Sequence, residues 1–231
     1  MWILAHRGAS KQAPENTQKA FRLAMAQQAT GVEFDTYQVE DEIIVIHDRR
    51  LERTTDGHGQ INNASLSYLR SLDAGDGEPI PFLTDALRCL PDNTICNVEI
   101  KSLYDIPRWL LALDAAVSQT GFNRDNLIVS SFNHRWLKRI HQLEPELKLG
   151  ALTSSYPEEG VAFAKKLNAF SVHVSLDVVD EELVKMAKEE GLPILVFTVD
   201  NPEDMLTLQA WGVDGIFTNV PEQAVSLLGS T

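Results

Sequence analysis

The sequence is poor in cysteine and in positive charge. Among its 231 residues there are two cysteines, and Lys and Arg number 20 against 33 Asp and Glu. Cys89 and Cys96 are too few for a disulfide framework and their spacing matches no metal-binding motif, so we expect two free thiols in a reducing compartment. The formal net charge of −13 argues against a nucleic-acid partner and against stable docking on an anionic membrane.

Long hydrophobic runs are also missing. No apolar stretch approaches the roughly 18 residues that a membrane span needs. No basic segment of the kind that opens a signal peptide precedes the first predicted strand, which begins at Trp2. Together with the free thiols, these features predict a cytoplasmic protein. The hydrophobic content of 44% is nevertheless enough for a large core.

Short apolar runs rich in β-branched residues alternate with amphipathic stretches along most of the chain. The predicted parallel strands are 2–5, 32–35, 95–100, 127–130, 148–151, 170–174, 194–199 and 215–217. The predicted helices are 17–29, 82–90, 106–119, 134–142, 158–167, 181–190, 202–210 and 221–228, the first of them with Asn16 as its start signal. Eight strand–helix units predict one domain over 1–231, a closed (β/α)₈ TIM barrel with its site at the carboxyl ends of the strands.

One further strand breaks this alternation. Only seven residues separate Asp35 from Ile43, where an apolar run begins that ends in His47 and Asp48. A parallel crossover needs about a dozen residues or more, so this strand should return antiparallel as a hairpin that turns near 40–42. That pairing places His47 roughly opposite Asp35 on the same face. Residues 49–80 then contain no strand–helix unit, and we interpret them as a compact insertion beside the site.

Charged side chains interrupt three strands that should be apolar. They are His6 and Arg7 at the end of the first strand, Glu33 and Asp35 in the second, and Glu99 and Lys101 in the third. Burying one such charge without a partner costs on the order of several kcal/mol. Three accidents of this kind are improbable, and the strand ends meet at one rim of a barrel. The sequence therefore predicts a shared site.

The residue types at this rim fit metal-assisted phosphoryl transfer. Glu33 and Asp35 are two apart and share a face, and with Glu99 they offer three carboxylates that suit Mg²⁺ or Ca²⁺. Zinc would prefer more nitrogen or sulfur ligands. The alternative is that these carboxylates only form ion pairs with Arg7 and Lys101. We disfavour it because buried ion pairs seldom stabilise a protein on balance.

The basic residues suggest separate roles in such a reaction. His6 and His47 could share acid and base work, since imidazole carries protons near neutral pH. Arg7 offers a planar fork for phosphate oxygens, and Lys101 offers a point contact. Gly8 would let the backbone approach a ligand closely. The sequence leaves open whether His173, which we place at a strand end, lines the pocket.

Five motifs occur in an order that resembles the glycerophosphodiester phosphodiesterase family. They are His6-Arg7-Gly8, Pro14-Glu15-Asn16-Thr17, Glu33-Phe34-Asp35, His47-Asp48 and Glu99-Ile100-Lys101. Residues 51–59 and 72–75 resemble that family's insertion, and 130–132, 197–200 and 214–218 extend the likeness towards the C-terminus.

The resemblance implies a barrel enzyme that uses a divalent metal to hydrolyse glycerophosphodiesters to sn-glycerol 3-phosphate and an alcohol. It implies metal ligation by Glu33, Asp35 and Glu99, and phosphate binding by Arg7 and Lys101. It also implies that His6 and His47 form the acid/base pair.

The sequence differs from the family at two positions of one motif. Phe197 stands where the family often has Trp, and Asp200 stands where Asn is usual, so substrate preference could differ. Two other functions stay open. One is the same chemistry on lysophospholipids, although the sequence offers no strongly basic amphipathic stretch for an interface. The other is a phosphate-binding barrel without catalysis, which should have lost a histidine or a carboxylate.

Overall fold

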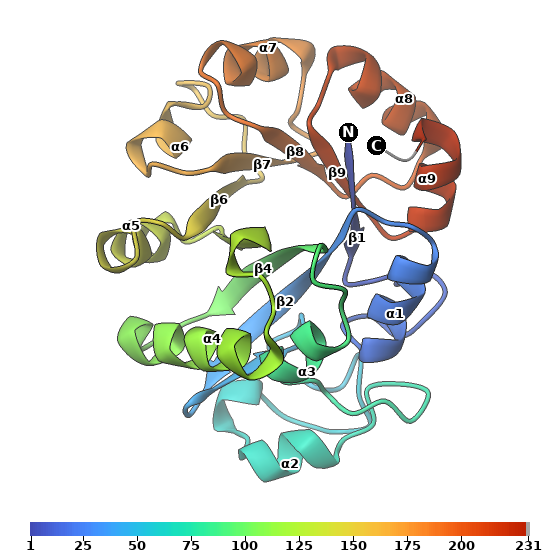
Figure 1. The fold of residues 1–231 in the computed structure, drawn as a ribbon, viewed down its shortest axis with the longest axis vertical. Helices are drawn as coiled ribbons and strands as arrows, with labels where there is room; N and C mark the ends of the chain where they lie inside the picture. The colour runs from blue at the N-terminus through green and yellow to red at the C-terminus, as the bar shows by residue number, and fades with distance from the viewer. Residues whose placement is uncertain (230–231) are drawn as a thin grey trace.

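The computed structural model describes residues 1–229, and within that range nine strands form one sheet. Eight are parallel and close into a barrel because β1 pairs with both β2 and β9 (Figure 1). They are β1 (Trp2–His6), β2 (Gly31–Val39), β4 (Ile95–Ser102), β5 (Leu127–Ser131), β6 (Lys148–Thr153), β7 (Ser171–Ser175), β8 (Ile194–Phe197) and β9 (Gly215–Thr218). The prediction of a TIM barrel is confirmed.

The predicted helices are present between these strands. They are α1 (Gln18–Ala26), α3 (Leu83–Arg88), α4 (Ile106–Thr120), α5 (His134–Leu143), α6 (Ala162–Lys166), α7 (Glu181–Glu189), α8 (Pro202–Trp211) and α9 (Pro221–Leu228), with a 3₁₀ turn η2 (Arg124–Asn126) before β5. The predicted start of the first helix is wrong by one residue. Thr17 caps α1, because its side chain accepts a hydrogen bond from the Ala20 amide, and Asn16 is free for another contact.

The predicted hairpin is also present, with a shift in register. β3 (Glu42–Val45) runs antiparallel to β2 and pairs Val45 with Thr36. The amide of Ile46 then donates to the carbonyl of Asp35 over 2.9 Å, so Ile46 takes the place expected for His47. β2 is longer than predicted because β3 supplies its neighbour beyond the end of β1.

Residues 49–80 pack against this hairpin and add no strand to the barrel. They contain the 3₁₀ turn η1 (Ile61–Asn63) and the helix α2 (Leu66–Ser71), which lies outside the ring of helices at the bottom of Figure 1. Their apolar residues form a separate buried cluster with the hairpin: Tyr37, Val39, Ile44, Ile46, Leu51, Ile61, Leu69, Leu72 and Ile80. The segment is therefore held by packing as well as by its two ends.

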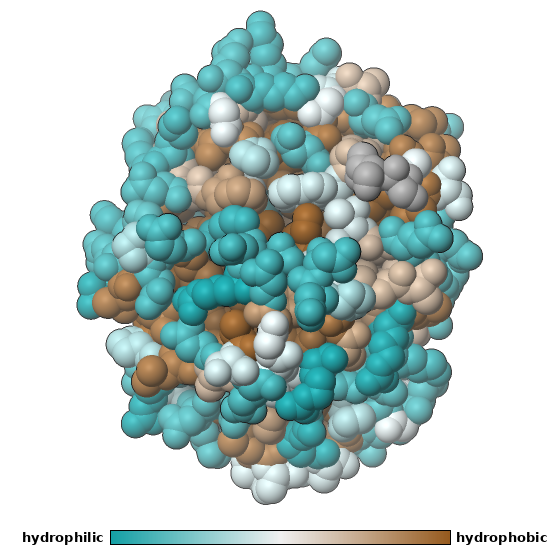
Figure 2. All heavy atoms as spheres, viewed as in Figure 1, coloured by the Kyte–Doolittle hydropathy of each residue, from teal (hydrophilic) through white to brown (hydrophobic). Residues whose placement is uncertain are grey.

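Side chains two residues apart on a strand point to the same face, so a packing residue of the barrel interior and a residue of the site can follow each other on one strand. Leu4 is fully buried with Leu195 and Phe217, and His6 follows it on the same face two residues later. Outside the barrel, polar side chains cover most of the face seen in Figure 2, with apolar atoms showing in smaller areas between them. Among the described residues, we find no helix with the length and apolar character needed to cross a membrane.

Candidate active site

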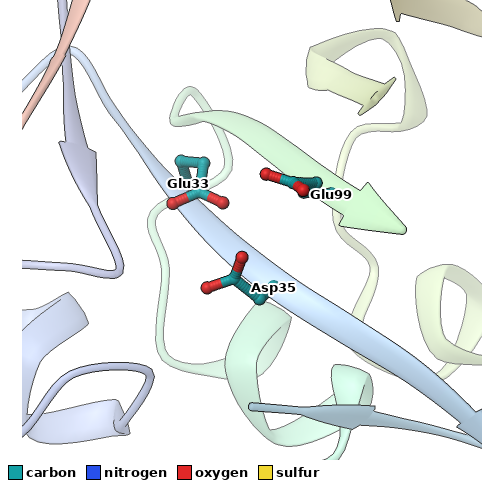
Figure 3. A group of neighbouring side chains, drawn as sticks. All are labelled: Glu33, Asp35 and Glu99. Carbon is teal, nitrogen blue, oxygen red and sulfur yellow. The ribbon is translucent and has the colours of Figure 1, made fainter. Parts of the chain in front are cut away.

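The structure brings the three predicted carboxylates together. Glu33 and Asp35 come from β2, and Glu99 stands beside Asp35 in the register of β4. Figure 3 shows the three side chains turned towards a common space. One oxygen from each lies within 4.8 Å of the others, and the side chains are only 4%, 1% and 12% exposed. Such crowding of buried acids calls for compensating positive charge.

The crowding and the burial of the three carboxyl groups shift their pKa values. Burial, together with Asp35 and Glu99, raises the pKa of Glu33 well above its usual value. Burial and the charge of Asp35 raise the pKa of Glu99 to about 7. Burial alone would raise the pKa of Asp35 too, but Arg7 and other nearby cations lower it.

The donor set fits a hard divalent cation. Oε1 of Glu33 is buried and has no hydrogen-bond partner within the described part of the chain. Three carboxylate oxygens at this separation are the ligands that Mg²⁺ and Ca²⁺ prefer. The trio could therefore hold a metal ion.

The two predicted phosphate-binding residues lie against the same carboxylates. Arg7 approaches Asp35 with Nε, at 3.1 Å from Oδ2, and Glu15 with Nη1, at 2.9 Å from Oε1. Lys101 places Nζ 2.8 Å from Glu99 Oε1 and 3.5 Å from Asp35 Oδ1. A guanidinium has five N–H donors and an ammonium has three, so both side chains keep donors for an anion.

His6 is anchored through one ring nitrogen. Its Nδ1 lies 2.7 Å from Oδ1 of Asn219, while its Nε2 lies 4.0 Å from Oε2 of Glu33. Burial and the neighbouring charge of Arg7 lower the pKa of His6. The imidazole is therefore biased towards its neutral form beside the carboxylates.

His47 is anchored in a similar way by different partners. Its Nδ1 lies 2.6 Å from Oδ1 of Asp48, and its carbonyl accepts a hydrogen bond from the Tyr37 hydroxyl. Asp48 is held in turn by Arg53, through Nε at 2.5 Å and Nη2 at 2.8 Å. The carboxylate thus remains ionised next to the ring, since its hydrogen bonds to Arg53 lower the pKa of Asp48.

Sequence reasoning missed Asn219, which anchors His6, and two residues of the loop after β1 that contact the site. Asn16 donates from Nδ2 to Asp35 Oδ2 over 3.0 Å and accepts from the Asp35 amide over 3.3 Å. Glu15 bridges Arg7 and Arg53 with short hydrogen bonds. Both belong to a motif that carried the family resemblance, which was the available signal, but the contacts depend on how the loop after β1 folds back.

Two expectations are modified by the structure, one by addition and one by correction. Gly8 has a structural reason that the sequence did not show: its φ is 80°, and a Cβ there would lie 2.6 Å from the carbonyl carbon of Ala20, so α1 requires the glycine, while its approach to a ligand stays a prediction. His173 lies within β7 and not at its end. It is fully buried, bonded to Ser171, and lines a cavity of about 20 Å³ with His6 and other side chains. Burial lowers its pKa to about 3.

A barrel rim that gathers three carboxylates, two basic side chains and two anchored histidines defines an enzyme that acts on phosphate esters. A sequence model of the Glycerophosphoryl diester phosphodiesterase family matches residues 6–223. The chain therefore belongs to this family, and it is a phosphoric diester hydrolase.

Individual relatives agree with this assignment. A glycerophosphodiester phosphodiesterase of Caldanaerobacter subterraneus is 37% identical, over 98% of this chain and 97% of its own. The structure of an Oleispira antarctica phosphodiesterase bound to the product sn-glycerol-3-phosphate has a TM-score of 0.91 and 30% identity, with 99% of this chain and 96% of that chain covered. The Thermotoga maritima glycerophosphodiester phosphodiesterase structure has a TM-score of 0.80, 29% identity and 97% coverage of both chains.

Proposed function

We propose that this enzyme hydrolyses glycerophosphodiesters to sn-glycerol 3-phosphate and an alcohol with the help of a divalent metal, Mg²⁺ or Ca²⁺. The observation that carries the proposal is the gathering of three buried carboxylates within 4.8 Å beside two basic side chains. The Oleispira antarctica relative, whose structure contains sn-glycerol-3-phosphate, supports the choice of product.

The substrate phosphate would be bound from two sides. Glu33, Asp35 and Glu99 would hold the cation, which when bound neutralises phosphate charge and polarises the phosphoryl group. Arg7 and Lys101 would contact the remaining phosphate oxygens with the N–H donors that their carboxylate partners leave free. The small-molecule substrate would thus be held by local charges, against a net charge of −13.

The two histidines would divide the proton transfers. His6, whose pKa is lowered, would accept the proton of the attacking water or hydroxyl at Nε2 as the new P–O bond forms. His47 is oriented by Asp48, whose Oδ1 lies 2.6 Å from the ring Nδ1. It would give its proton to the leaving alcohol as the other P–O bond breaks.

The setting of the reaction is also part of the proposal. We propose that the chain acts as one barrel domain, with 49–80 as an insertion that shapes substrate choice. The structure contains Cys89 and Cys96 as free thiols, which supports a reducing compartment such as the cytoplasm.

The metal requirement is tested by chelation. Excess chelator should abolish release of glycerol 3-phosphate from a panel of glycerophosphodiesters, and Mg²⁺ or Ca²⁺ should restore it. Full turnover in a sample shown by elemental analysis to be metal-free would contradict the proposal.

The roles of the histidines are tested by substitution. His6→Ala and His47→Ala should each lower kcat by about 10²–10⁴-fold while metal affinity stays close to the wild-type value. On a nitrophenyl phosphodiester, whose leaving group needs little protonation, His47→Ala should recover much of its rate and His6→Ala should not. Equal recovery in both variants would refute the assignment of acid and base.

A further inference from the structure

The loops after β8 and β9 are joined by a pair of polar residues, Asp200 and Asn219. Oδ1 of Asp200 accepts a hydrogen bond from the backbone amide of Asn219 over 2.8 Å, and Oδ2 accepts one from Asn219 Nδ2 over 2.7 Å. The Thr218 hydroxyl also donates to Oδ1, over 3.3 Å. Both oxygens of the carboxylate are therefore occupied by one neighbouring residue.

This pairing fixes which way the Asn219 amide points. A carboxylate only accepts hydrogen bonds, so Asn219 must present its NH₂ group to Asp200 and its Oδ1 to the other side. On that side, Oδ1 lies 2.7 Å from Nδ1 of His6 and 2.8 Å from Oγ of Ser10. Since an amide oxygen can only accept, the neutral His6 ring must carry its proton on Nδ1.

The position of this proton determines the state of the other ring nitrogen, Nε2. With the proton on Nδ1, the lone pair of His6 is on Nε2, the nitrogen that lies 4.0 Å from Glu33 Oε2 among the carboxylates. The alternative tautomer would place a hydrogen there, and the ring could not accept a proton at that position.

We propose that Asp200 is a positioning residue, which sets the tautomer of His6 through the orientation of Asn219. This inference rests on the proposed function, in which His6 Nε2 is the base. It gives a role to residue 200, which is Asp in this sequence and often Asn in the family.

The isosteric change Asp200→Asn should reverse the tautomer. The new amide oxygen would keep the hydrogen bond from the Asn219 backbone, so the new NH₂ group would face the Asn219 side chain. Asn219 would then turn its oxygen to residue 200 and its NH₂ group to His6 Nδ1, which must accept. The proton of the neutral ring would move to Nε2.

A second substitution, Asn219→Asp, should reverse the effect of Asp200→Asn. In Asp200→Asn/Asn219→Asp, the carboxylate at residue 219 can accept both from the amide at residue 200 and from His6 Nδ1. The double variant should therefore return the proton to Nδ1. Asp177→Asn is the matched control, because this acidic residue is exposed and lies beyond the neighbouring strand β7.

The experiment reads the tautomer directly by long-range ¹H–¹⁵N NMR of histidine-labelled protein with Mg²⁺ added, well above the pKa of His6. The His6 signals are assigned by their loss in His6→Ala. Wild type, the control and the double variant should show Nδ1–H, and Asp200→Asn should show Nε2–H. In parallel, kcat of Asp200→Asn should fall about 10²–10⁴-fold, and the double variant should recover to within about tenfold of wild type.

The outcomes separate this inference from the function on which it rests. Retention of Nδ1–H in Asp200→Asn, or failure of the double variant to restore it, would overturn the role of Asp200 whatever the rates. Reversal of the tautomer with unchanged kcat would uphold the role of Asp200 and refute His6 as the base.

Discussion

At the scale of single residues, the turn after β1 shows how backbone geometry places Arg7, the proposed phosphate contact. Arg7 has a φ of 59°, in a region that few non-glycine residues adopt. Its amide donates both to the carbonyl of Glu33, over 2.9 Å, and to Oε2 of the same residue, over 3.0 Å. These bonds hold the backbone at the end of β1 to β2. The guanidinium is thereby placed between Asp35 and Glu15.

Arg7→Lys tests whether the geometry of the guanidinium matters beyond its charge. An ammonium cannot reproduce the contacts of Nε and Nη1 and also bind phosphate through a planar fork. We expect kcat/KM to fall by about tenfold or more, which corresponds to about 1.4 kcal/mol of transition-state stabilisation. The measurement is steady-state kinetics on glycerophosphodiesters, with Arg88→Lys, an exposed arginine, as the control. An unchanged kcat/KM would show that Arg7 is not the phosphate contact.

At the scale of elements, the β2–β3 hairpin and the segment 49–80 behave as one unit. Leu51, Ile61 and Leu69 are fully buried against the hairpin, so replacing the segment by a short linker would expose apolar surface. The segment also supplies Arg53, which binds Asp48 and Glu15. It therefore touches the partners of both His47 and Arg7, and its influence is best tested by a single substitution.

Arg53→Ala should loosen His47 while leaving the metal site intact. Removing the guanidinium frees Asp48 from its hydrogen bonds at Nε and Nη2, and Asp48 alone must then hold the His47 ring. Because the Arg53 side chain is 48% exposed, we expect a loss in kcat of only up to about fivefold, with Mg²⁺ affinity unchanged by calorimetry. Arg50→Ala removes an arginine that pairs with Glu52 and serves as the control. A selective loss of metal affinity in Arg53→Ala would show that the segment supports the carboxylates instead.

At the scale of the whole molecule, the closed barrel holds mutually repelling carboxylates together at its rim. The net charge of −13 adds a general excess of acid to the three carboxylates that β2 and β4 bring together. In the absence of metal, folding must bury these three carboxylates, and burial raises the pKa of Glu99 to about 7 from its usual value of 4.5. Stability should consequently depend on both pH and metal.

The direction in which folding stability changes with pH follows from the raised pKa of Glu99. Between 4.5 and about 7 the folded state holds a proton on Glu99 that the unfolded state releases, so this contribution to stability is lost as pH rises through about 7. The lowered pKa values of His6 and His173 make stability rise with pH over part of this range. Because both histidines are also present in Glu99→Gln, the difference in stability between wild type and that variant removes their contribution. In urea denaturation without metal, the stability of wild type relative to Glu99→Gln should fall between about pH 5 and about pH 8.

Metal should stabilise wild type more than Glu99→Gln. At 100 times its dissociation constant, Mg²⁺ should add about 2.7 kcal/mol to the unfolding free energy of wild type, and distinctly less to Glu99→Gln at the same concentration. An equal gain in both proteins would mean that Glu99 is not a ligand.

The sequence alone determined the elements and much of the rim. Apolar runs of strand length separated by helical patterns predicted eight units, and the short connection before Ile43 required an antiparallel return. Strand alternation placed Glu33 and Asp35 on one face, because a period of two is a local property. The short helix α2 was missed, since it lies in the segment 49–80, where no predicted strand marks a strand–helix unit.

The tertiary structure decided which side chains meet. Asn16 reaches Asp35 instead of capping α1, and Asn219 lies 213 residues from the ring of His6 that it orients. Asp200 would act through that contact. Such pairs arise when β1 closes the barrel between β2 and β9, which brings the first and last loops together. The sequence therefore determined the chemical groups and the strands that carry them, while closure of the barrel set their hydrogen-bond partners, because these are separated too far along the chain for any local pattern to record.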